Sequence, residues 1–106
     1  MKFMLLCYDD EAAWQRVGEA ELMAAMQEAV QITHELHARG QYNLASPLQP
    51  TATAKSVRVR NGQRIVTDGP FAETREQLGG YYLVDAPDLD QAIAGPFTER
   101  FAERVK

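Results

Sequence analysis

Residues 79–84 read GGYYLV, and this stretch decides the fold because it forms a short strand that is apolar on both faces. Residues 2–8 read KFMLLCY and are also apolar after the lysine, so their side chains point alternately to opposite faces. Both faces of each strand need to be covered. The two stretches therefore predict neighbouring strands, with residues 79–84 in a central position.

A hairpin is expected between these two strands. Residues 56–60 (SVRVR) alternate valine with arginine, which is typical of a half-exposed strand. Asn61 and Gly62 both tolerate a positive φ, so residues 63–67 should return antiparallel to residues 56–60. Residues 42–48 are a weaker strand candidate.

The remaining segments favour helices. A short helical turn over residues 11–16 precedes a longer helix over residues 19–39, which Gly40 ends. One apolar stripe of that helix is suited to packing on a sheet, and it comprises Leu22, Met26, Ala29, Thr33 and Leu36. Another helix should start at Leu89, after the N-cap residue Asp88.

This order of elements (β, α, β, hairpin, β, α) predicts an α+β fold. We expect a ferredoxin-like sandwich with an inserted β-hairpin, in which helices cover one face of an antiparallel sheet. The chain fits a single domain, residues 1–106. Because the two strands are apolar on both faces and helices cover only one, we expect a homodimer through the open sheet face. The alternative is that loops cover that face.

Composition argues against several classes of protein. A formal net charge of −4 disfavours a nucleic-acid partner, which needs a phosphate-neutralising basic surface. No stretch approaches the roughly 18 apolar residues of a membrane helix, so we expect a soluble protein without a membrane partner. Cys7 is the only cysteine, and a buried, inert thiol in a reducing cytoplasm is the expected outcome.

Residues 66–82, VTDGPFAETREQLGGYY, resemble the signature of the DGPF branch of the YCII-related family. Further agreement, including the opening KFMLLCYDDEAAW, extends the resemblance over about residues 1–94. The resemblance implies a ferredoxin-like fold that pairs two subunits sheet to sheet as a dimeric α/β barrel, with a pocket between sheet and helices. It implies no settled activity. The broader superfamily includes lyases, isomerases and monooxygenases, and association with bacterial sigma factors implies a stress-linked or regulatory role.

The chain departs from that family near its end. Relatives finish with a strand at the sheet edge, whereas here Pro96 breaks the last helix because proline cannot continue the hydrogen-bond ladder. Phe97, Phe101 and Val105 recur every four residues. Residues 97–106 therefore predict a separate short helix whose apolar stripe docks on the body or on a second subunit.

Asp68 is the candidate catalytic residue. In one interpretation it is a general base at the rim of a pocket, desolvated beside Phe71. In the other it is a turn aspartate whose carboxylate caps backbone N–H groups. Related YCII proteins are suspected of using a His-Asp pair, and only the aspartate of that pair carries over here, to Asp68.

The candidate binding residues surround Asp68 in the sequence, and they are Gly69, Pro70, Phe71, Glu73, Arg75 and Tyr81. Arg75 is the candidate for binding a small anionic ligand, because a guanidinium can grip a carboxylate in a bidentate fork. The alternative for both Glu73 and Arg75 is that they belong to a solvated charged loop that contributes little. Tyr81 and Tyr82 point to opposite sides of the strand, so one should face the helices and the other the open face or a cavity.

The sequence carries no pattern typical of a metal or cofactor site, and none is expected. It lacks a glycine-rich phosphate loop, a Ser/His/Asp order and a Cys/His metal spacing. His34 and His37 lie three apart, but a metal site would need a third ligand. His37 is expected in the core. Gly79 and Gly80 precede a strand, so they predict a bulge or a close backbone approach.

Three functions remain open. The first is a small-molecule enzyme of the lyase or isomerase class, with Asp68 as base and Arg75 orienting an anionic substrate. The second is a non-catalytic ligand-binding or regulatory module. The third is a purely structural loop. A concave pocket where Asp68 meets an arginine would favour the first, and a solvent-facing Asp68 would favour the third.

Overall fold

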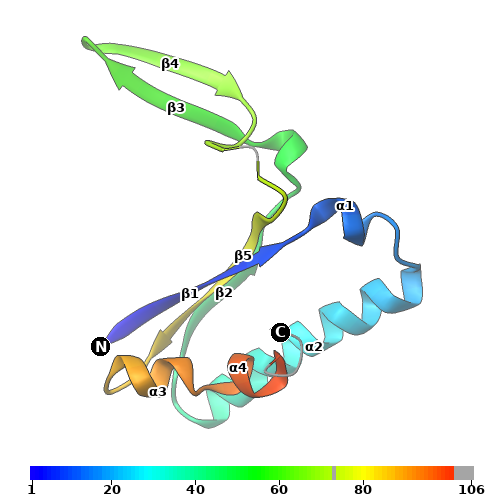
Figure 1. The fold of residues 1–106 in the computed structure, drawn as a ribbon. Helices are drawn as coiled ribbons and strands as arrows, with labels where there is room; N and C mark the ends of the chain where they lie inside the picture. The colour runs from blue at the N-terminus through cyan, green and yellow to red at the C-terminus, as the bar shows by residue number, and fades with distance from the viewer. Residues whose placement is uncertain (73, 102–106) are drawn as a thin grey trace.

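The computed structural model describes residues 1–72 and 74–101 of the chain. It has an α+β fold with two antiparallel sheets, and helices cover one face of the larger sheet (Figure 1). The strands are β1 (Lys2–Asp9), β2 (Tyr42–Pro47), β3 (Lys55–Arg60), β4 (Gln63–Asp68) and β5 (Gln77–Asp85). The helices are α1 (Glu11–Trp14), α2 (Glu19–Ala38), α3 (Leu89–Ile93) and α4 (Pro96–Phe101), with a short 3-10 turn at Thr51–Thr53.

The larger sheet has the strand order β1-β5-β2, with both pairs antiparallel. The prediction that β5 is central beside β1 is therefore confirmed. Leu5 lies opposite Tyr82 on the face that the helices cover, whereas Leu6 lies opposite Tyr81 on the other face. Leu6 remains 50% exposed, so this second face is open within the single chain.

Two glycines shape the middle of this sheet, as the sequence predicted. The register between β1 and β5 shifts between Cys7 and Tyr8, which makes Gly79 the extra residue of a bulge. A Cβ atom on Gly80 would lie 3.0 Å from the carbonyl oxygen of Ser46. Glycine therefore allows β2 to approach the central strand closely.

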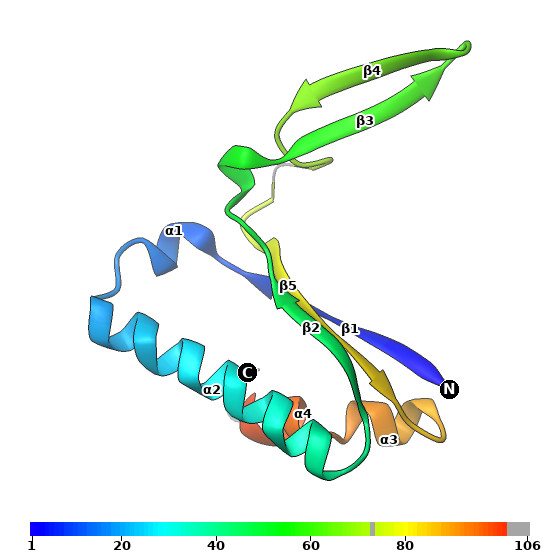
Figure 2. The same cartoon turned by 180° about the vertical axis from the view of Figure 1, so that it is seen from behind.

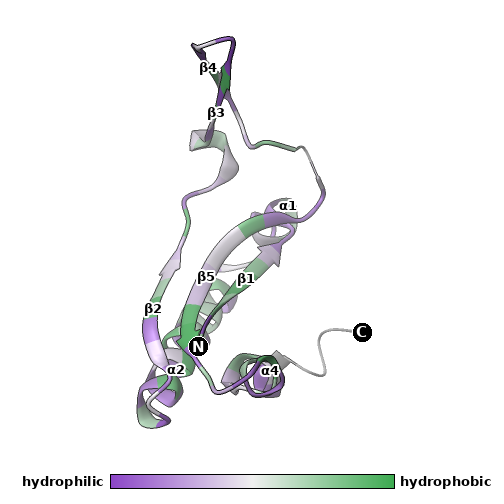
Figure 3. Ribbon diagram, turned by 90° about the vertical axis from the view of Figure 1, so that its left-hand side faces the viewer, coloured by the Kyte–Doolittle hydropathy of each residue, from purple (hydrophilic) through white to green (hydrophobic). Residues whose placement is uncertain are grey.

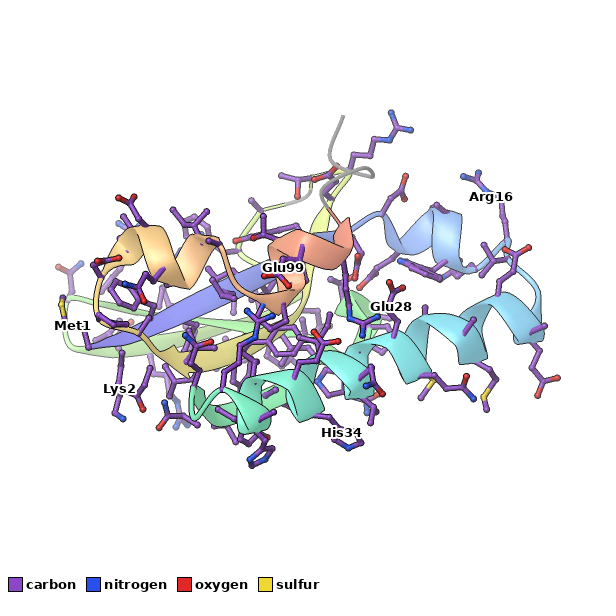
Figure 4. The ribbon with its side chains drawn as sticks, turned by 90° about the horizontal axis from the view of Figure 1, so that it is seen from below. Met1, Lys2, Arg16, Glu28, His34 and Glu99 are labelled. Atoms are coloured by element: carbon purple, nitrogen blue, oxygen red, sulfur yellow. The ribbon has the colours of Figure 1, made fainter. Side chains whose placement is uncertain are left out.

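The core lies between the sheet and the helices, and its buried residues are Ile32, Leu36, Tyr82, Val84, Ala86 and Ala92. Figure 4 shows α2, α3 and α4 lying across this face of the sheet. The predicted stripe on α2 is only partly correct, because Leu36 is buried but Leu22 and Met26 are exposed. Helix α2 carries apolar residues on more than one face, so its periodicity did not identify the packed one.

The end of the described chain forms the predicted separate helix. Asp88 caps α3 by accepting a hydrogen bond from the backbone N–H of Gln91 (2.9 Å), and α4 begins at Pro96. The Phe97 ring packs against the Tyr82 ring with 5.8 Å between centroids, so α4 docks on the core. Val105, the third member of the predicted stripe, lies outside the described residues.

Strands β3 and β4 form a two-stranded hairpin that projects beyond the end of the sheet (Figures 1 and 2). Asn61 (φ 52°) and Gly62 (φ 74°) both adopt the left-handed conformation at its tip. We call residues 55–68 the arm. Its side chains are almost all exposed.

The thiol of Cys7 faces the helix-covered side of the sheet and is partly buried. Burial raises the pKa of Cys7 to about 11, and the negative charge of Asp9 adds to the rise. The thiol is therefore protonated near neutral pH, as expected for an inert cysteine. Within the described residues, no helix combines the length and apolarity needed to cross a membrane.

Candidate functional site

Asp68, the predicted catalytic residue, lies at the base of the arm. Its side chain is 88% exposed and forms an ion pair with Lys55, its neighbour across the hairpin. Its ionic partner is thus Lys55 rather than Arg75, and within one chain its carboxylate lacks a desolvated environment. This position favours a structural role for Asp68 over that of a general base.

The rest of the DGPF loop is attached to the base of the arm. Gly69 has a φ of 94°, a conformation that favours glycine, and its N–H donates to the carbonyl oxygen of Ala54 (2.8 Å). Pro70 is partly buried. The exposed ring of Phe71 faces the guanidinium of Arg58, which lies 4.9 Å from the ring centroid. These contacts fix the loop and leave the Asp68 side chain exposed.

The other predicted binding residues lie apart from one another. Arg75 reaches α1, where its Nε donates to the carboxylate of Asp10 (3.3 Å). Tyr81 is partly buried on the open face of the sheet, opposite Leu6. Glu73 lies outside the described residues. Of the predicted site residues, Arg75 is the one that lines the surface cleft described next.

A surface cleft of about 470 Å³ lies between α1 and the segment that follows the DGPF loop. Its lining residues are Asp10, Glu11, Ala12, Arg16, Thr51, Thr74, Arg75 and Gln77. Arg16 enters from the turn between α1 and α2 (Figure 4). The cleft thus combines two guanidinium groups, two carboxylates and several hydroxyl and amide groups.

Hydrogen bonds hold the walls of this cleft in place. The carboxylate of Glu11 accepts from the backbone N–H (2.9 Å) and the hydroxyl (2.7 Å) of Thr51. Asp10 caps α1 by accepting from the N–H of Ala13 (3.2 Å). That hydrogen bond, followed by the interaction with Arg75, lowers the pKa of Asp10. Asp10 and Glu11 are therefore engaged in structural hydrogen bonds, and the lowered pKa of Asp10 favours its ionised form.

Asp9 differs from these two neighbours. It ends β1 opposite Gln77. A Cβ atom added to Gly79 would come within 2.5 Å of the Asp9 carboxylate oxygen, so only glycine fits beside this side chain without a shift. Burial raises the pKa of Asp9, a hydrogen bond with the Trp14 side chain opposes that rise, and the charge of Glu76 adds to it. Gly79 thus leaves room for a partly buried carboxyl group beside the cleft.

Four residues at or beside the cleft were not predicted from the sequence, and they are Asp9, Glu11, Arg16 and Thr51. The one sequence pattern that pointed to them was the run of three acidic residues, 9–11, directly after an apolar strand. Polar side chains at a strand end are often functional, but the same residues also suited a helix N-terminus. The link between residue 51 and α1 spans 40 positions and has no local sequence pattern.

Within residues 1–72 and 74–101, no three His, Cys, Asp or Glu side chains are close enough together to hold a metal ion. His34 points away from the sheet on the outer side of α2 (Figure 4). His37 is exposed and stacks on the Tyr42 ring with 4.2 Å between centroids, so the prediction of a core histidine is wrong. Of the apolar stripe that predicted its burial, Leu36 packs in the core, whereas Leu22 and Met26 are exposed.

Two comparisons with known proteins identify the family. The sequence profile of the YCII-related domain matches residues 1–104. An uncharacterized protein from Rhizobium meliloti is 37% identical over 93 residues, which cover 88% of this chain and 75% of that protein. The chain belongs to the YCII-related family.

Proposed function

We propose that this member of the YCII-related family is a homodimeric small-molecule enzyme of the lyase or isomerase class. In this proposal it transfers a proton on an anionic substrate bound in the cleft beside α1. The observation that carries the proposal is the position of Asp9. This partly buried carboxyl group with a raised pKa directly precedes Asp10 and pairs with Gln77, and those two residues line the cleft together with two arginines.

Asp9 suits proton transfer better than the other carboxyl groups of the site. A carboxyl group with a raised pKa is a stronger base when ionised and a usable acid when protonated. Asp10 and Glu11 are engaged by hydrogen bonds, and Asp68 is paired with Lys55. The Asp9 carboxylate would take a proton from a substrate carbon and return it to another carbon, or to a leaving group.

Arg75 and Arg16 support an anionic substrate. A substrate carboxylate could displace Asp10 from Arg75, because the Arg75 side chain is 88% exposed and solvent weakens such an ion pair. Arg16 supplies a second positive charge on the same cleft. A planar guanidinium binds carboxylates and carbonyl oxygens with defined geometry, which would fix the substrate relative to Asp9.

The homodimer part of the proposal rests on the open face of the sheet. Its exposed or partly exposed apolar side chains come from all three strands, and they are Met4, Leu6, Tyr8, Leu44, Tyr81 and Leu83. The accessible surface of 8127 Å² exceeds the roughly 5,900 Å² typical of a monomer of this mass. The excess is larger than the roughly 800 Å² that each partner buries in a standard interface.

The reaction class can be tested without knowing the substrate. The wild-type protein is incubated in D2O with a panel of small keto acids and hydroxy acids, and proton NMR follows exchange at the carbon next to the carbonyl or carboxyl group. We expect exchange with at least one compound. Asp9→Asn should abolish that exchange, whereas Asp68→Asn should retain it.

Arginine variants separate binding from turnover. Arg75→Gln should remove the thermal stabilisation that the active compound confers, and Arg60→Gln, a change at an exposed arginine near the arm tip, should preserve it. Stabilisation without exchange in the wild type would support the non-catalytic binding module instead. Neither stabilisation nor exchange with any compound would argue against the cleft as a ligand site.

A further inference from the structure

We propose that the arm is an intersubunit clamp, which packs its valine face on a second copy of this chain bound at the open sheet face. The inference rests on the homodimer proposed above and adds a second contact surface to it. The experiment below therefore reports separately on the dimer and on the arm.

The two faces of the arm differ in composition. Residues paired across the hairpin share a face, so Val57 and Val66, which are directly opposite, lie on the same face as Val59. Their exposed fractions are 60%, 53% and 71%. Arg58, opposite Ile65, lies on the other face, where its guanidinium contacts the Phe71 ring. In the described part of the chain, the valine face is left largely exposed.

An isolated two-stranded hairpin is at best marginally stable in water and needs a surface for its apolar face. In the described part of the chain, neither β3 nor β4 makes more than a marginal contact with any other helix or strand. Ala54 and Ser56 hold only the base of the arm, through their hydrogen bonds to Gly69. In this proposal the required surface comes from another molecule.

The direction of the arm identifies where that molecule sits. In Figures 1 and 2 the arm leans to the side of the sheet opposite α2, which is the side of the open face. Figure 3 shows it standing beyond the end of the sheet, clear of the helices. The radius of gyration of 16.2 Å exceeds the roughly 13 Å of a compact domain of this length. A second copy on the open face would lie within reach of the arm.

Charge favours a second copy over other partners. The arm holds four of the eleven basic residues, Lys55, Arg58, Arg60 and Arg64, but one of the fifteen acidic residues, Asp68. Its net charge is +3, whereas the rest of the chain carries −7. A basic arm is thus complementary to the acidic body of an identical subunit.

The direct test uses an equal mixture of ¹³C-labelled and unlabelled full-length protein. An isotope-filtered NOE experiment detects contacts between the labelled valine methyl groups of one chain and protons of the other chain. We expect intermolecular contacts from Val57, Val59 and Val66. A dimeric mass without such contacts would overturn the clamp while leaving the sheet interface intact, and a monomeric wild type would overturn both.

Substitutions give an independent readout. Changing the three valines together to threonine keeps their β-branched shape and replaces one methyl group of each with a hydroxyl. This variant should raise the dimer dissociation constant about tenfold or more, whereas Ile65→Thr on the other face should change it by less than about threefold. Equal effects of the two changes would contradict the assignment of the valine face as the contact surface.

Discussion

The arm and the body of this protein use similar side chains with opposite results. In the body, which is the three-stranded sheet with α2, α3 and α4, Ile32 and Val84 are buried between the helices and the sheet. In the arm, Val57 and Val59 alternate with arginine along β3 but remain exposed. The difference shows that alternation determines which face of a strand is apolar, whereas the docked element determines whether that face is buried.

The open sheet face lies between these two extremes. β1 buries Phe3 and Leu5 partly against the helices, but Leu6 on its other face stays half-exposed. One face of this strand therefore packs against the core, whereas the other face is uncovered. A second copy of the chain would convert both the sheet face and the arm into buried surface.

Removing a core side chain from the body should have the largest effect. Ile32→Ala removes a fully buried side chain of α2 and should lower the free energy of unfolding by about 2–5 kcal/mol. Urea denaturation measures the change. Val59→Ala in the arm should alter stability mainly through dimer formation, so its effect should depend on protein concentration. A loss below about 1 kcal/mol for Ile32→Ala would contradict the assigned core.

Placing a charge on the open sheet face should separate the subunits. Leu6→Lys would bury an unpaired ammonium in the proposed interface and should raise the dissociation constant about 100-fold. Analytical ultracentrifugation provides the measurement. Leu89→Lys is the matched control, because Leu89 is a similarly exposed leucine on α3, away from that face. If both variants kept the wild-type mass, the sheet face would not be the interface.

The close approach of β2 to β5 should tolerate no side chain at Gly80. A Cβ atom there would meet the backbone of Ser46 and Pro47 at 3.0 and 3.3 Å, so Gly80→Ala should cost about 1–3 kcal/mol. Gly79→Ala should cost less, because its Cβ atom meets the mobile end of the Asp9 side chain. Thermal unfolding of the two variants would refute this account if their order of stability were reversed.

The smallest effect concerns the pH dependence of stability. Because the pKa of Asp9 is higher in the folded chain than its ordinary value of 3.8, the folded state binds this proton more tightly than the unfolded state does. The wild type should therefore lose stability relative to Asp9→Asn as pH rises from about 3 through the folded pKa. Urea midpoints of both proteins between about pH 3 and pH 7 provide the test. Parallel curves would show that folding does not raise the pKa of Asp9.

The strands were predictable because their signals are local. Asn61-Gly62 placed the hairpin, and the apolar run at residues 79–84 placed the central strand. The packed face of α2 was less accessible, since apolar residues such as Met26 and Ile32 lie on different faces of the helix. Only tertiary contact with the sheet selects one of them.

The candidate site was the least predictable part. Asp68 belongs to a conspicuous motif, yet its neighbour across the hairpin is Lys55, so the motif holds the base of the arm. The cleft depends on contacts between segments distant in sequence, such as Arg75 with Asp10. Arg75 was found because a guanidinium suggests anion binding wherever it lies, whereas Asp9 acquires its raised pKa only from burial in the fold.

The solution mass of the full-length chain tests the central claim most directly, because both proposed contact surfaces, the open sheet face and the arm, depend on a second copy. Light scattering coupled to gel filtration should be run at several concentrations in the micromolar range. We predict a mass about twice that of the 11.9 kDa chain. A mass of one chain at every concentration would contradict the account.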